Sequence, residues 1–329
     1  MKILAGNGNR RLAEAICRYL GMPLGNVEVG RFPDGELDVK INEDVRGRDV
    51  FIIQSTCPPV NENLMELLVM VDAARRASAS RITAVMPYYG YARKDRKDEG
   101  RVPITAKLVA NLLTTAGVSR VLALDLHATQ IQGFFDVPVD HLFAKPIFVR
   151  HFREHFGPSR LREVVFAAPD VGRAKMARAY SGQLGGGLAL VDKRRISAEE
   201  TDIGFVIGDV AGREVVLLDD MISTGGTVVT AANALKRAGA KCIRVAAVHA
   251  LFCGQAAERL AAAPIEEILV TDSVPLNCRA QALEQQGRIR VLTVAGLLGE
   301  AMRRIHTNQS VSSLFSDNPK ESPPWASLP

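Results

Sequence analysis

The sequence predicts an α/β protein of two similar units, each with a mostly parallel sheet flanked by helices. Apolar, β-branched runs of strand length alternate with stretches of helical periodicity along the chain. The alternation is clear from residue 51 and starts again near residue 164, after a bridging helix at 144–155. Consecutive strands separated by helices form parallel sheets, because a crossover is needed to start the next strand in the same direction.

In the first half, glycines at 6 and 8 indicate a strand-to-helix turn, and residues 28–41 indicate a hairpin. The turn is not a dinucleotide fingerprint, because Arg11 stands where the third glycine would be. β-branched runs and helical spacing then predict these elements in order: strand 51–56, helix 61–77, strand 81–89, helix 104–117 and strand 121–127.

The alternation of strands and helices starts again in the second half. The predicted elements are strand 164–170, helix 173–184, strand 188–193, strand 215–220, helix 226–238 and strand 242–251. A last strand and helix at 288–306 can return to either unit. We therefore expect an N-terminal domain at 1–145, a C-terminal domain at 146–303, a segment at 304–316 that can return to the first domain, and a disordered Pro/Ser-rich tail at 317–329.

Composition narrows the class of protein. Of 329 residues, 47% are hydrophobic and 23% charged, which is typical of a globular protein. Neither a membrane span of about 18 apolar residues nor a signal peptide is recognisable, so we expect a cytoplasmic protein without membrane contact. The five cysteines contain no CxxC pair, which argues against a disulfide framework or a thiolate metal site.

The net charge of +5 has two interpretations. It would suit nucleic acid, but only 5% of the residues are aromatic and the basic residues form no compact tract. Dispersed lysines and arginines fit phosphorylated small molecules at least as well. We therefore expect no nucleic-acid partner.

One stretch, VVLLDDMISTGGT at 215–227, carries the strongest chemical signal. Asp219 and Asp220 end a predicted parallel strand, and the carboxyl ends of such strands carry the functional loops. The loop residues that follow can fold backbone N–H groups around an anion beside a helix N-terminus; they are Ser223, Thr224, Gly225, Gly226 and Thr227. A ligand whose phosphate binds the loop and whose neighbouring hydroxyls bind the carboxylates is a sugar phosphate. The alternative is an ordinary strand cap and turn.

The stretch resembles the ribose-5-phosphate signature of phosphoribosyltransferases and of ribose-phosphate pyrophosphokinases (phosphoribosyl pyrophosphate synthetases). Further segments resemble the latter family in the same order: 61–97, 103–113, DLHATQIQGFFDVPVDHL at 125–142, APDVG at 168–172, VDKRR at 191–195 and SVSSLFS at 310–316. The resemblance covers nearly all of residues 3–316 and is to the phosphate-regulated class. It implies two phosphoribosyltransferase-like domains and transfer of a diphosphoryl group from ATP to ribose 5-phosphate, with Mg²⁺ as cofactor.

The resemblance also implies roles for residues. It makes His127 and Asp170 ligands of Mg²⁺, with Asp125, Asp136 and Asp140 as weaker candidates. It makes Lys193 and Arg195 the catalytic pair, with Arg195 also binding the ribose 5-phosphate. Without the resemblance, both residues would be interpreted as part of a solvated run of charges. No general base is recognisable, which suits a reaction that depends on positioning and charge stabilisation.

The resemblance places the adenine of ATP on the hairpin, partly from a neighbouring subunit, with these residues: Phe32, Asp34, Gly35, Glu36, Arg93 and Lys94. It also implies a homohexamer that phosphate activates and ADP inhibits, with an allosteric site at Arg46, Arg101, Gln132, Ser310 and Ser312. The chain differs from the family pattern at three positions: Lys94 replaces a glutamine, Arg173 the second glycine of the diphosphate loop, and Ser223 an aspartate.

Two other functions stay open on the sequence. A phosphoribosyltransferase would leave the 125–142 segment and Lys193 unexplained. A non-catalytic regulatory subunit would keep the fold and bind nucleotides. Arg173 is the feature that favours the regulatory subunit, because a side chain there fills a place where the backbone is expected to approach the diphosphate.

Overall fold

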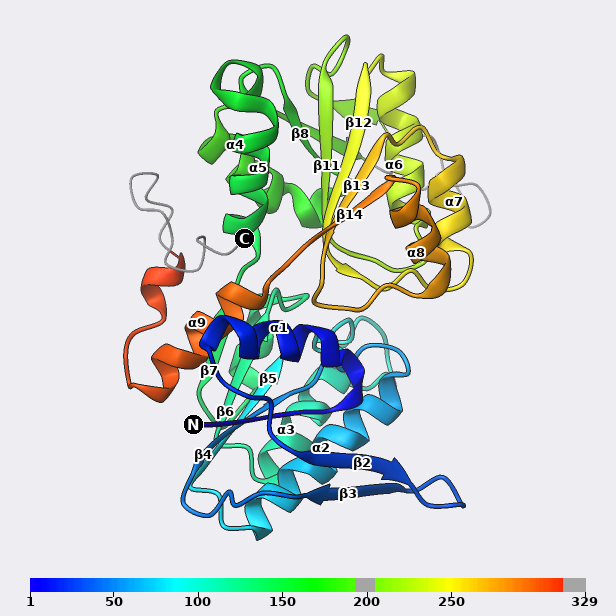
Figure 1. The fold of residues 1–329 in the computed structure, drawn as a ribbon. Helices are drawn as coiled ribbons and strands as arrows, with labels where there is room; N and C mark the ends of the chain where they lie inside the picture. Colours follow the sequence, from blue (N-terminus) through cyan, green and yellow to red (C-terminus); the bar gives the residue numbers. More distant parts are fainter. Residues whose placement is uncertain (193–204, 316–329) are drawn as a thin grey trace. The chain divides into compact units, whose positions relative to one another are not determined.

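The computed structural model describes residues 1–192 and 205–315. The chain divides into two compact units, one formed by Met1–Phe143 with the described residues from Thr293 onward, the other by Ala144–Leu292 (Figure 1). Each unit is a sheet with helices on both faces. The fold class that the sequence predicts is confirmed.

The first unit contains a parallel sheet of five strands in the order β1-β4-β5-β6-β7. The strands are β1 (Lys2–Ala5), β4 (Asp49–Ile53), β5 (Arg81–Met86), β6 (Arg120–Leu124) and β7 (Val139–Leu142). The predicted hairpin is present as an antiparallel pair, β2 (Val27–Arg31) and β3 (Leu37–Ile41), which forms a separate two-stranded sheet.

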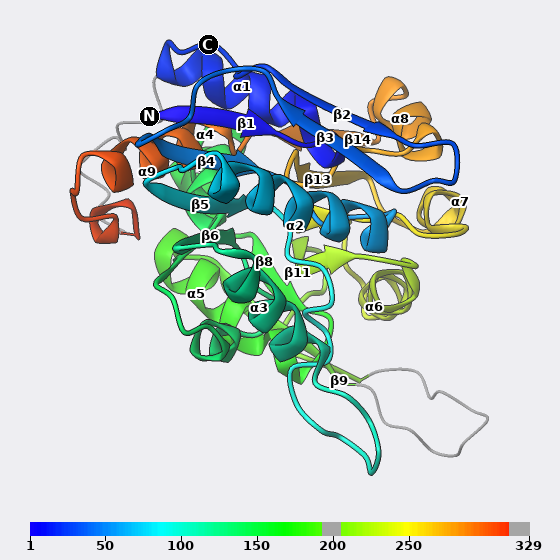
Figure 2. The same cartoon turned by 90° about the horizontal axis from the view of Figure 1, so that it is seen from below.

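Helices cover the sheet of the first unit. Helices α2 (Val60–Arg76) and α3 (Thr105–Ala116) share a hydrophobic core with alternate residues of β4, β5 and β6. The opposite side carries α1 (Arg10–Leu20), which follows the short helix η1 (Asn7–Asn9), and α9 (Ala295–His306) (Figures 1 and 2). The chain between β6 and β7 contains η2 (Thr129–Phe134), and the described chain ends with η4 (Ser312–Phe315).

The second unit contains a sheet of seven strands in the order β10-β9-β8-β11-β12-β13-β14. The strands are β8 (Val165–Ala168), β9 (Gly187–Asp192), β10 (Phe205–Ile207), β11 (Glu214–Ile222), β12 (Cys242–Ala250), β13 (Glu267–Thr271) and β14 (Ile289–Leu292). Neighbouring strands are parallel except β9 and β10, which are antiparallel.

The two faces of this sheet have different cores, because successive strand residues point to opposite sides. On one face, Val165 and Ala167 pack with α6 (Gly226–Arg237), α7 (Ala256–Ala262) and α8 (Cys278–Gln285). On the other, Phe166 lies 5.9 Å from the ring of Phe152 and 6.2 Å from that of Tyr180. These rings belong to α4 (Lys145–Leu161) and α5 (Ala174–Leu184), and η3 (Val171–Arg173) precedes α5.

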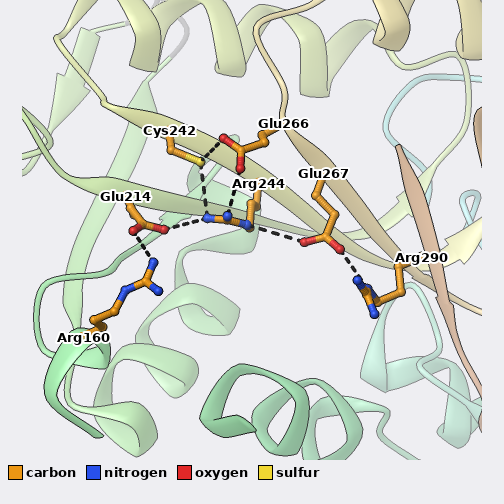
Figure 3. A network of polar contacts seen from close by, with 7 residues as sticks. All are labelled: Arg160, Glu214, Cys242, Arg244, Glu266, Glu267 and Arg290. Atoms are coloured by element: carbon orange, nitrogen blue, oxygen red, sulfur yellow. Dashed lines mark hydrogen bonds and ion pairs between the residues drawn. The ribbon is translucent and has the colours of Figure 1, made fainter. Parts of the chain in front are cut away.

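Ion pairs hold together the amino ends of the strands in this unit (Figure 3). Arg244 of β12 is only 10% exposed and lies 2.7 Å from Glu214 of β11 and 3.5 Å from Glu267 of β13. Two further ion pairs belong to this network: Arg160 lies 2.6 Å from Glu214, and Arg290 lies 2.8 Å from Glu267. Part of the basic composition is therefore balanced by structural carboxylates at this edge.

The C-terminal helix α9 belongs to the first unit. The hydroxyl of Tyr19 in α1 donates to Glu300 of α9 at 3.3 Å, and His306 lies 2.7 Å from Asp49 of β4. The second unit accordingly ends at Leu292, so the domain expected at 146–303 is too long at its C-terminal end. The helical pattern of 295–306 was visible in the sequence, but its partner was not, because an apolar helix face fits either core.

Replacing Glu300 with glutamine is expected to lower the free energy of unfolding by about 2 kcal/mol, because the carboxylate is buried with two arginines. Arg304 contacts it at 2.7 Å and Arg303 at 2.8 Å, and Glu300 itself is 1% exposed. Urea unfolding measures the loss. Replacing Glu14 with glutamine, which breaks the exposed pair with Arg10, is the control and should change stability by at most about 0.5 kcal/mol.

The same carboxylate predicts an acid dependence. Burial raises the pKa of Glu300, but the hydrogen bonds donated by Arg303 and Arg304 outweigh it and leave the pKa below its usual value. The ionised carboxylate therefore stabilises the fold above its unfolded pKa of about 4.3, and this contribution is lost as the pH falls through the folded pKa. If replacing Glu300 with glutamine lowered the free energy of unfolding equally at neutral and acidic pH, the ionised carboxylate would not be the stabilising group.

None of the helices in the described ranges combines the length and hydrophobicity that crossing a bilayer requires.

Candidate active site

The candidate active site of the second unit lies at the carboxyl edge of its sheet. Because β8, β9 and β11 are neighbouring parallel strands, their carboxyl ends meet there. Asp170 follows β8, Asp192 ends β9, and Asp219 and Asp220 lie near the end of β11. The predicted location of the two adjacent carboxylates, at the end of a parallel strand, is therefore what the structure shows.

Asp219 and Asp220 are buried, with side chains only 10% and 6% exposed. Both are bound by Arg173 of η3. Its Nε lies 3.2 Å from Oδ1 of Asp219, and its Nη2 lies 2.7 Å from Oδ2 of Asp220. Oδ1 of Asp219 also accepts a hydrogen bond from the backbone N–H of Asp220 at 2.8 Å. The guanidinium thus spans the carboxylate pair.

The environment of the pair perturbs its ionisation. Burial, together with the hydrogen bond and the negative charge of Asp220, raises the pKa of Asp219 to about 8. The positive charge of Arg173 acts in the opposite direction and lowers it. A buried carboxyl group whose pKa is raised in this way, beside a second acid at a sheet edge, is typical of a functional residue.

The loop after β11 leads directly into α6. Gly225 has φ +76°, a conformation that favours glycine, and it precedes the first residue of the helix. The segment that follows β12 holds this loop in place, because the N–H of Cys253 donates to the carbonyl of Ser223 at 2.8 Å. Thr224 and Thr227 are exposed, and no side chain in the described part of the chain caps the amino end of α6. Its first N–H groups are therefore available to an anion.

Asp170 caps the short helix η3. Its Oδ1 accepts a hydrogen bond from the backbone N–H of Arg173 at 3.2 Å, which fixes the turn that carries the arginine. A Cβ at Gly172 would lie 3.1 Å from this oxygen, so the turn is compact around the carboxylate. Asp170 and Arg173 are consequently one local structure at the end of β8.

The predicted catalytic residues Lys193 and Arg195 lie outside the described residues. Before this gap, the last described residue is Asp192, which ends β9, and β9 is adjacent to β8 in the sheet. The predicted tail at 317–329 also lies outside the described residues.

The predicted metal ligands belong to both units: Asp170 is in the second, and the others are in the first. Asp125 and His127 follow β6, and Asp125 has φ +40°, while Asp136 is exposed between η2 and β7. Asp140 pairs at 2.6 Å with Arg120, the first residue of β6. Its carboxylate is therefore directed toward the amino end of β6, whereas Asp125 and His127 follow the carboxyl end. Among the described residues, no group of three or more His, Cys, Asp or Glu side chains is placed to hold a metal ion.

The predicted adenine residues lie at an exposed turn. Phe32 is 48% exposed, and its N–H donates to the carbonyl of Glu36 at 2.8 Å. Gly35 has φ +95°, and Oδ1 of Asp34 accepts from the N–H of Glu36 at 3.1 Å. An aromatic ring held on a structured hairpin but left largely exposed can stack on a flat ligand. Elsewhere in the unit, Arg93 is exposed and Lys94 pairs with Asp98 at 3.0 Å.

The predicted allosteric residues all belong to the first unit and are exposed. Their described hydrogen bonds are local. Arg46 donates to Ser78 at 3.3 Å, Gln132 donates to the carbonyl of Thr129 at 2.9 Å, and the N–H of Ser312 donates to Ser310 at 3.2 Å. Arg101 adopts φ +64°. These contacts do not join the residues into one site.

The contact of Arg173 with both carboxylates is not predicted by the sequence, which marks this residue only as a departure from a family pattern. The signal that could have found it is strand order. β8 and β11 are neighbours although β9 and β10 separate them in the chain, so the turn after β8 lies beside the end of β11.

Comparisons with known proteins identify the family of the chain. Residues 1–117 match the profile of the N-terminal domain of ribose phosphate pyrophosphokinase, and residues 188–316 match that of the phosphoribosyl synthetase-associated domain. The chain is 53% identical over 320 residues to the ribose-phosphate pyrophosphokinase of Rhodopirellula baltica, covering 96% of this chain and 99% of that protein. It is also 53% identical over 315 residues to the enzyme of the same name from Agrobacterium fabrum, covering 96% and 100%.

Among solved structures, the phosphoribosylpyrophosphate synthetase from Mycobacterium smegmatis superposes with a TM-score of 0.86 at 39% identity, covering 93% of this chain and 99% of that one. Both matching profiles, the identity over nearly the whole length and the shared fold lead to the same conclusion. The chain belongs to the ribose-phosphate pyrophosphokinase family.

Proposed function

We propose that this protein transfers the β,γ-diphosphoryl group of ATP to O1 of ribose 5-phosphate, forming 5-phospho-α-D-ribose 1-diphosphate (PRPP) and AMP for nucleotide biosynthesis. The observation that carries the proposal is the contiguous arrangement at the end of β11. Two buried carboxylates are followed by a glycine-containing loop and the uncapped amino end of α6.

Ribose 5-phosphate fits this arrangement. The phosphate would be held by the N–H groups and hydroxyls of residues 223–227, where the helix dipole favours negative charge. The carboxylates of Asp219 and Asp220 would accept hydrogen bonds from the sugar hydroxyls. Charge-assisted hydrogen bonds of this kind are shorter and stronger than neutral ones, so they fix the orientation of the sugar.

In the reaction, O1 of the sugar attacks the β-phosphorus of ATP. The bond from this phosphorus to the oxygen that bridges the α- and β-phosphates breaks, AMP leaves, and the proton of O1 is released to solvent. The chain supplies fixed positive charge that stabilises the crowded phosphates. This stabilisation is the largest contribution to the rate that is expected in such a transfer. We assign this role to Lys193 and Arg195, which follow β9, with Arg195 also close to the ribose 5-phosphate.

A divalent cation would neutralise further charge on the phosphates, and we propose Mg²⁺. Mg²⁺ prefers oxygen and keeps several waters, so one or two protein ligands beside the substrate phosphates suffice. We propose Asp170 as one such ligand, because it uses only Oδ1 for the N–H of Arg173, and His127 of the first unit as a second candidate. Asp140 fits less well because Arg120 already holds its carboxylate.

The test is formation of AMP and PRPP from ATP, ribose 5-phosphate and Mg²⁺ by the purified protein. Production of both in equal amounts is expected. A protein that binds ATP without forming AMP would instead be a regulatory subunit. A protein that consumes PRPP with a free base, and forms none from ATP, would be a phosphoribosyltransferase.

For the adenine site, we propose stacking on Phe32, with the rest of the hairpin turn and the Arg93–Lys94 segment contributing to ATP. Replacing Phe32 with alanine is expected to raise KM for ATP about 10-fold, since stacking contributes about 1–3 kcal/mol per base. Thermal stability should stay nearly unchanged, because the ring is 48% exposed. Replacing Leu108, an apolar residue of α3 that is 55% exposed, with alanine is the control. Equal KM values for ATP in both variants would reject the adenine site.

We further propose a cytoplasmic homo-oligomer, with the hexamer as the expected form. The exposed hairpin tip supports this, because it could reach the nucleotide of a neighbouring copy. Light scattering of the purified protein tests the assembly. Phosphate activation through Arg46, Arg101, Gln132 and the 310–313 segment is a separate proposal, which rate measurements with and without phosphate would test.

A further inference from the structure

Arg173 is placed to control the carboxylate pair at the end of β11. Its guanidinium contacts Asp219 at 3.2 Å and Asp220 at 2.7 Å, and its side chain is only 19% exposed. A planar guanidinium with several N–H donors suits this task, because it can bind two carboxylates at once and remains charged at any physiological pH.

The strand pairing explains why the arginine reaches this place. β8 pairs with β11 through Val215, Val216 and Leu217, so the ladder stops before Asp219. Beyond that point β11 continues, while the chain after β8 turns into η3. The cap formed by Asp170 fixes the backbone of Arg173 beside the end of β11, on the side where β8 no longer pairs with it. The contact therefore arises from the scaffold.

Two buried acids next to each other cannot both ionise easily. Burial and the charge of Asp220 favour a proton on Asp219, whereas the charge of Arg173 opposes it. A shared proton would leave the pair with one fewer charged acceptor for a sugar hydroxyl. Removing the guanidinium would thus weaken the pair as an acceptor site, unless the pH were raised.

Other charged or titratable groups surround the pair. Asp170 lies in the same turn as Arg173, and Arg259 of α7 donates to the carbonyl of Thr224 at 3.5 Å. On β12, His249 is in register with Met221, and its Nδ1 lies 2.9 Å from the hydroxyl of Ser273. Arg173 itself forms an ion pair with each of Asp219 and Asp220.

We propose that Arg173 is a positioning residue that enables both carboxylates to accept the sugar hydroxyls at physiological pH without itself binding the sugar. The inference deepens the proposed function and rests on it for the identity of the sugar. It gives the arginine a role in substrate binding, whereas in the sequence the same residue is the feature that favours the alternative of a regulatory subunit.

The kinetic test compares wild type, Arg173→Ala and Arg173→Lys at saturating ATP and Mg²⁺, between about pH 6.5 and pH 10. In wild type, KM for ribose 5-phosphate should fall as the pH rises through the region where the pair ionises. In Arg173→Ala this fall should move to higher pH, giving a KM about 10-fold above wild type near pH 7.5 and a smaller difference near pH 10. Arg173→Lys should restore most of the wild-type profile. Arg237→Ala, which removes an exposed charge at the far end of α6, should match wild type.

Three results would overturn the inference. A lower KM in Arg173→Ala at every pH would mean that the guanidinium competes with the sugar for the carboxylates. An increase that is the same at every pH would mean that Arg173 only supports the local fold. A profile for Arg237→Ala that matches Arg173→Ala would mean that the effect is a general loss of charge.

A second measurement separates this inference from the proposed function. With carboxyl-¹³C-labelled aspartate, and with Asp219→Asn to assign the signals, the pH titration of the pair can be followed in the full chain without substrate. The midpoint should lie higher in Arg173→Ala than in wild type. An unchanged midpoint would refute the inference even in an active enzyme, and a shifted midpoint would support it even if wild type made no AMP.

Discussion

Replacing Lys193 with alanine is expected to lower kcat for AMP and PRPP formation by about 10³-fold, the scale observed when a group that stabilises transition-state charge is removed. Lys193 follows directly on Asp192, the last residue of β9, and β9 is adjacent to the strand that leads to Asp170. In the proposed mechanism this cation stabilises the migrating diphosphoryl group, where negative charge accumulates during the transfer. Steady-state and single-turnover rates of AMP formation measure the effect.

The control for this prediction is Lys241→Ala. Lys241 is exposed and precedes β12 at the opposite edge of the sheet, so its loss removes the same charge from the same unit without affecting the site. Its kcat should stay within about twofold of wild type, consistent with the small influence of a distant, screened charge. If kcat of Lys193→Ala stayed within tenfold of wild type while Lys241→Ala behaved normally, Lys193 would not be the catalytic cation.

Replacing Asp220 with asparagine should raise KM for ribose 5-phosphate by about 10- to 100-fold, because a charged hydrogen bond contributes about 1.5–3 kcal/mol. The side chain is only 6% exposed and binds Arg173 at 2.7 Å, so the substitution removes both the charged acceptor and the partner of the guanidinium. Asparagine keeps the size of the side chain, which limits changes in packing. The dependence of the initial rate on ribose 5-phosphate concentration measures the effect.

Asp209→Asn is the matched control. Asp209 lies in the same unit, is 72% exposed and pairs with Arg213 at 3.4 Å, so its substitution should leave KM within about twofold of wild type. Thermal unfolding of both variants shows whether they are folded. A folded Asp220→Asn protein with an unchanged KM for ribose 5-phosphate would exclude Asp220 from the sugar site.

The proposed sugar-phosphate site of the second unit is built from features that are local in the chain. Asp219 and Asp220, the loop and the start of α6 are contiguous, and local backbone geometry brings them together whatever the rest of the fold does. For this reason the sequence predicts the local arrangement of these residues well, and the sugar-phosphate site itself stays a prediction. The predicted strand at 215–220 corresponds to β11 at Glu214–Ile222, and the predicted helix at 226–238 to α6 at Gly226–Arg237.

Segments without a strong pattern were not predicted. Residues 252–287 contain α7, β13 and α8, of which the two helices have seven and eight residues. Such short helices give a weak periodic signal, because two turns carry too few apolar positions to establish a period. Strand β7 was also not predicted, because its four residues, VDHL, form neither an apolar run nor an alternating pattern of strand length.

By itself, the sequence determined the α/β class, most strands and helices, and the group of residues at 219–227, because each of these depends on short-range spacing and backbone preference. The tertiary structure decided the rest. It placed α9 on the first unit through Tyr19 and Asp49, and it brought Arg173 onto Asp219 and Asp220 by making β8 and β11 neighbours. Strand order and helix docking depend on which distant surfaces pack together, and burial changes the ionisation of a side chain only once that packing is complete.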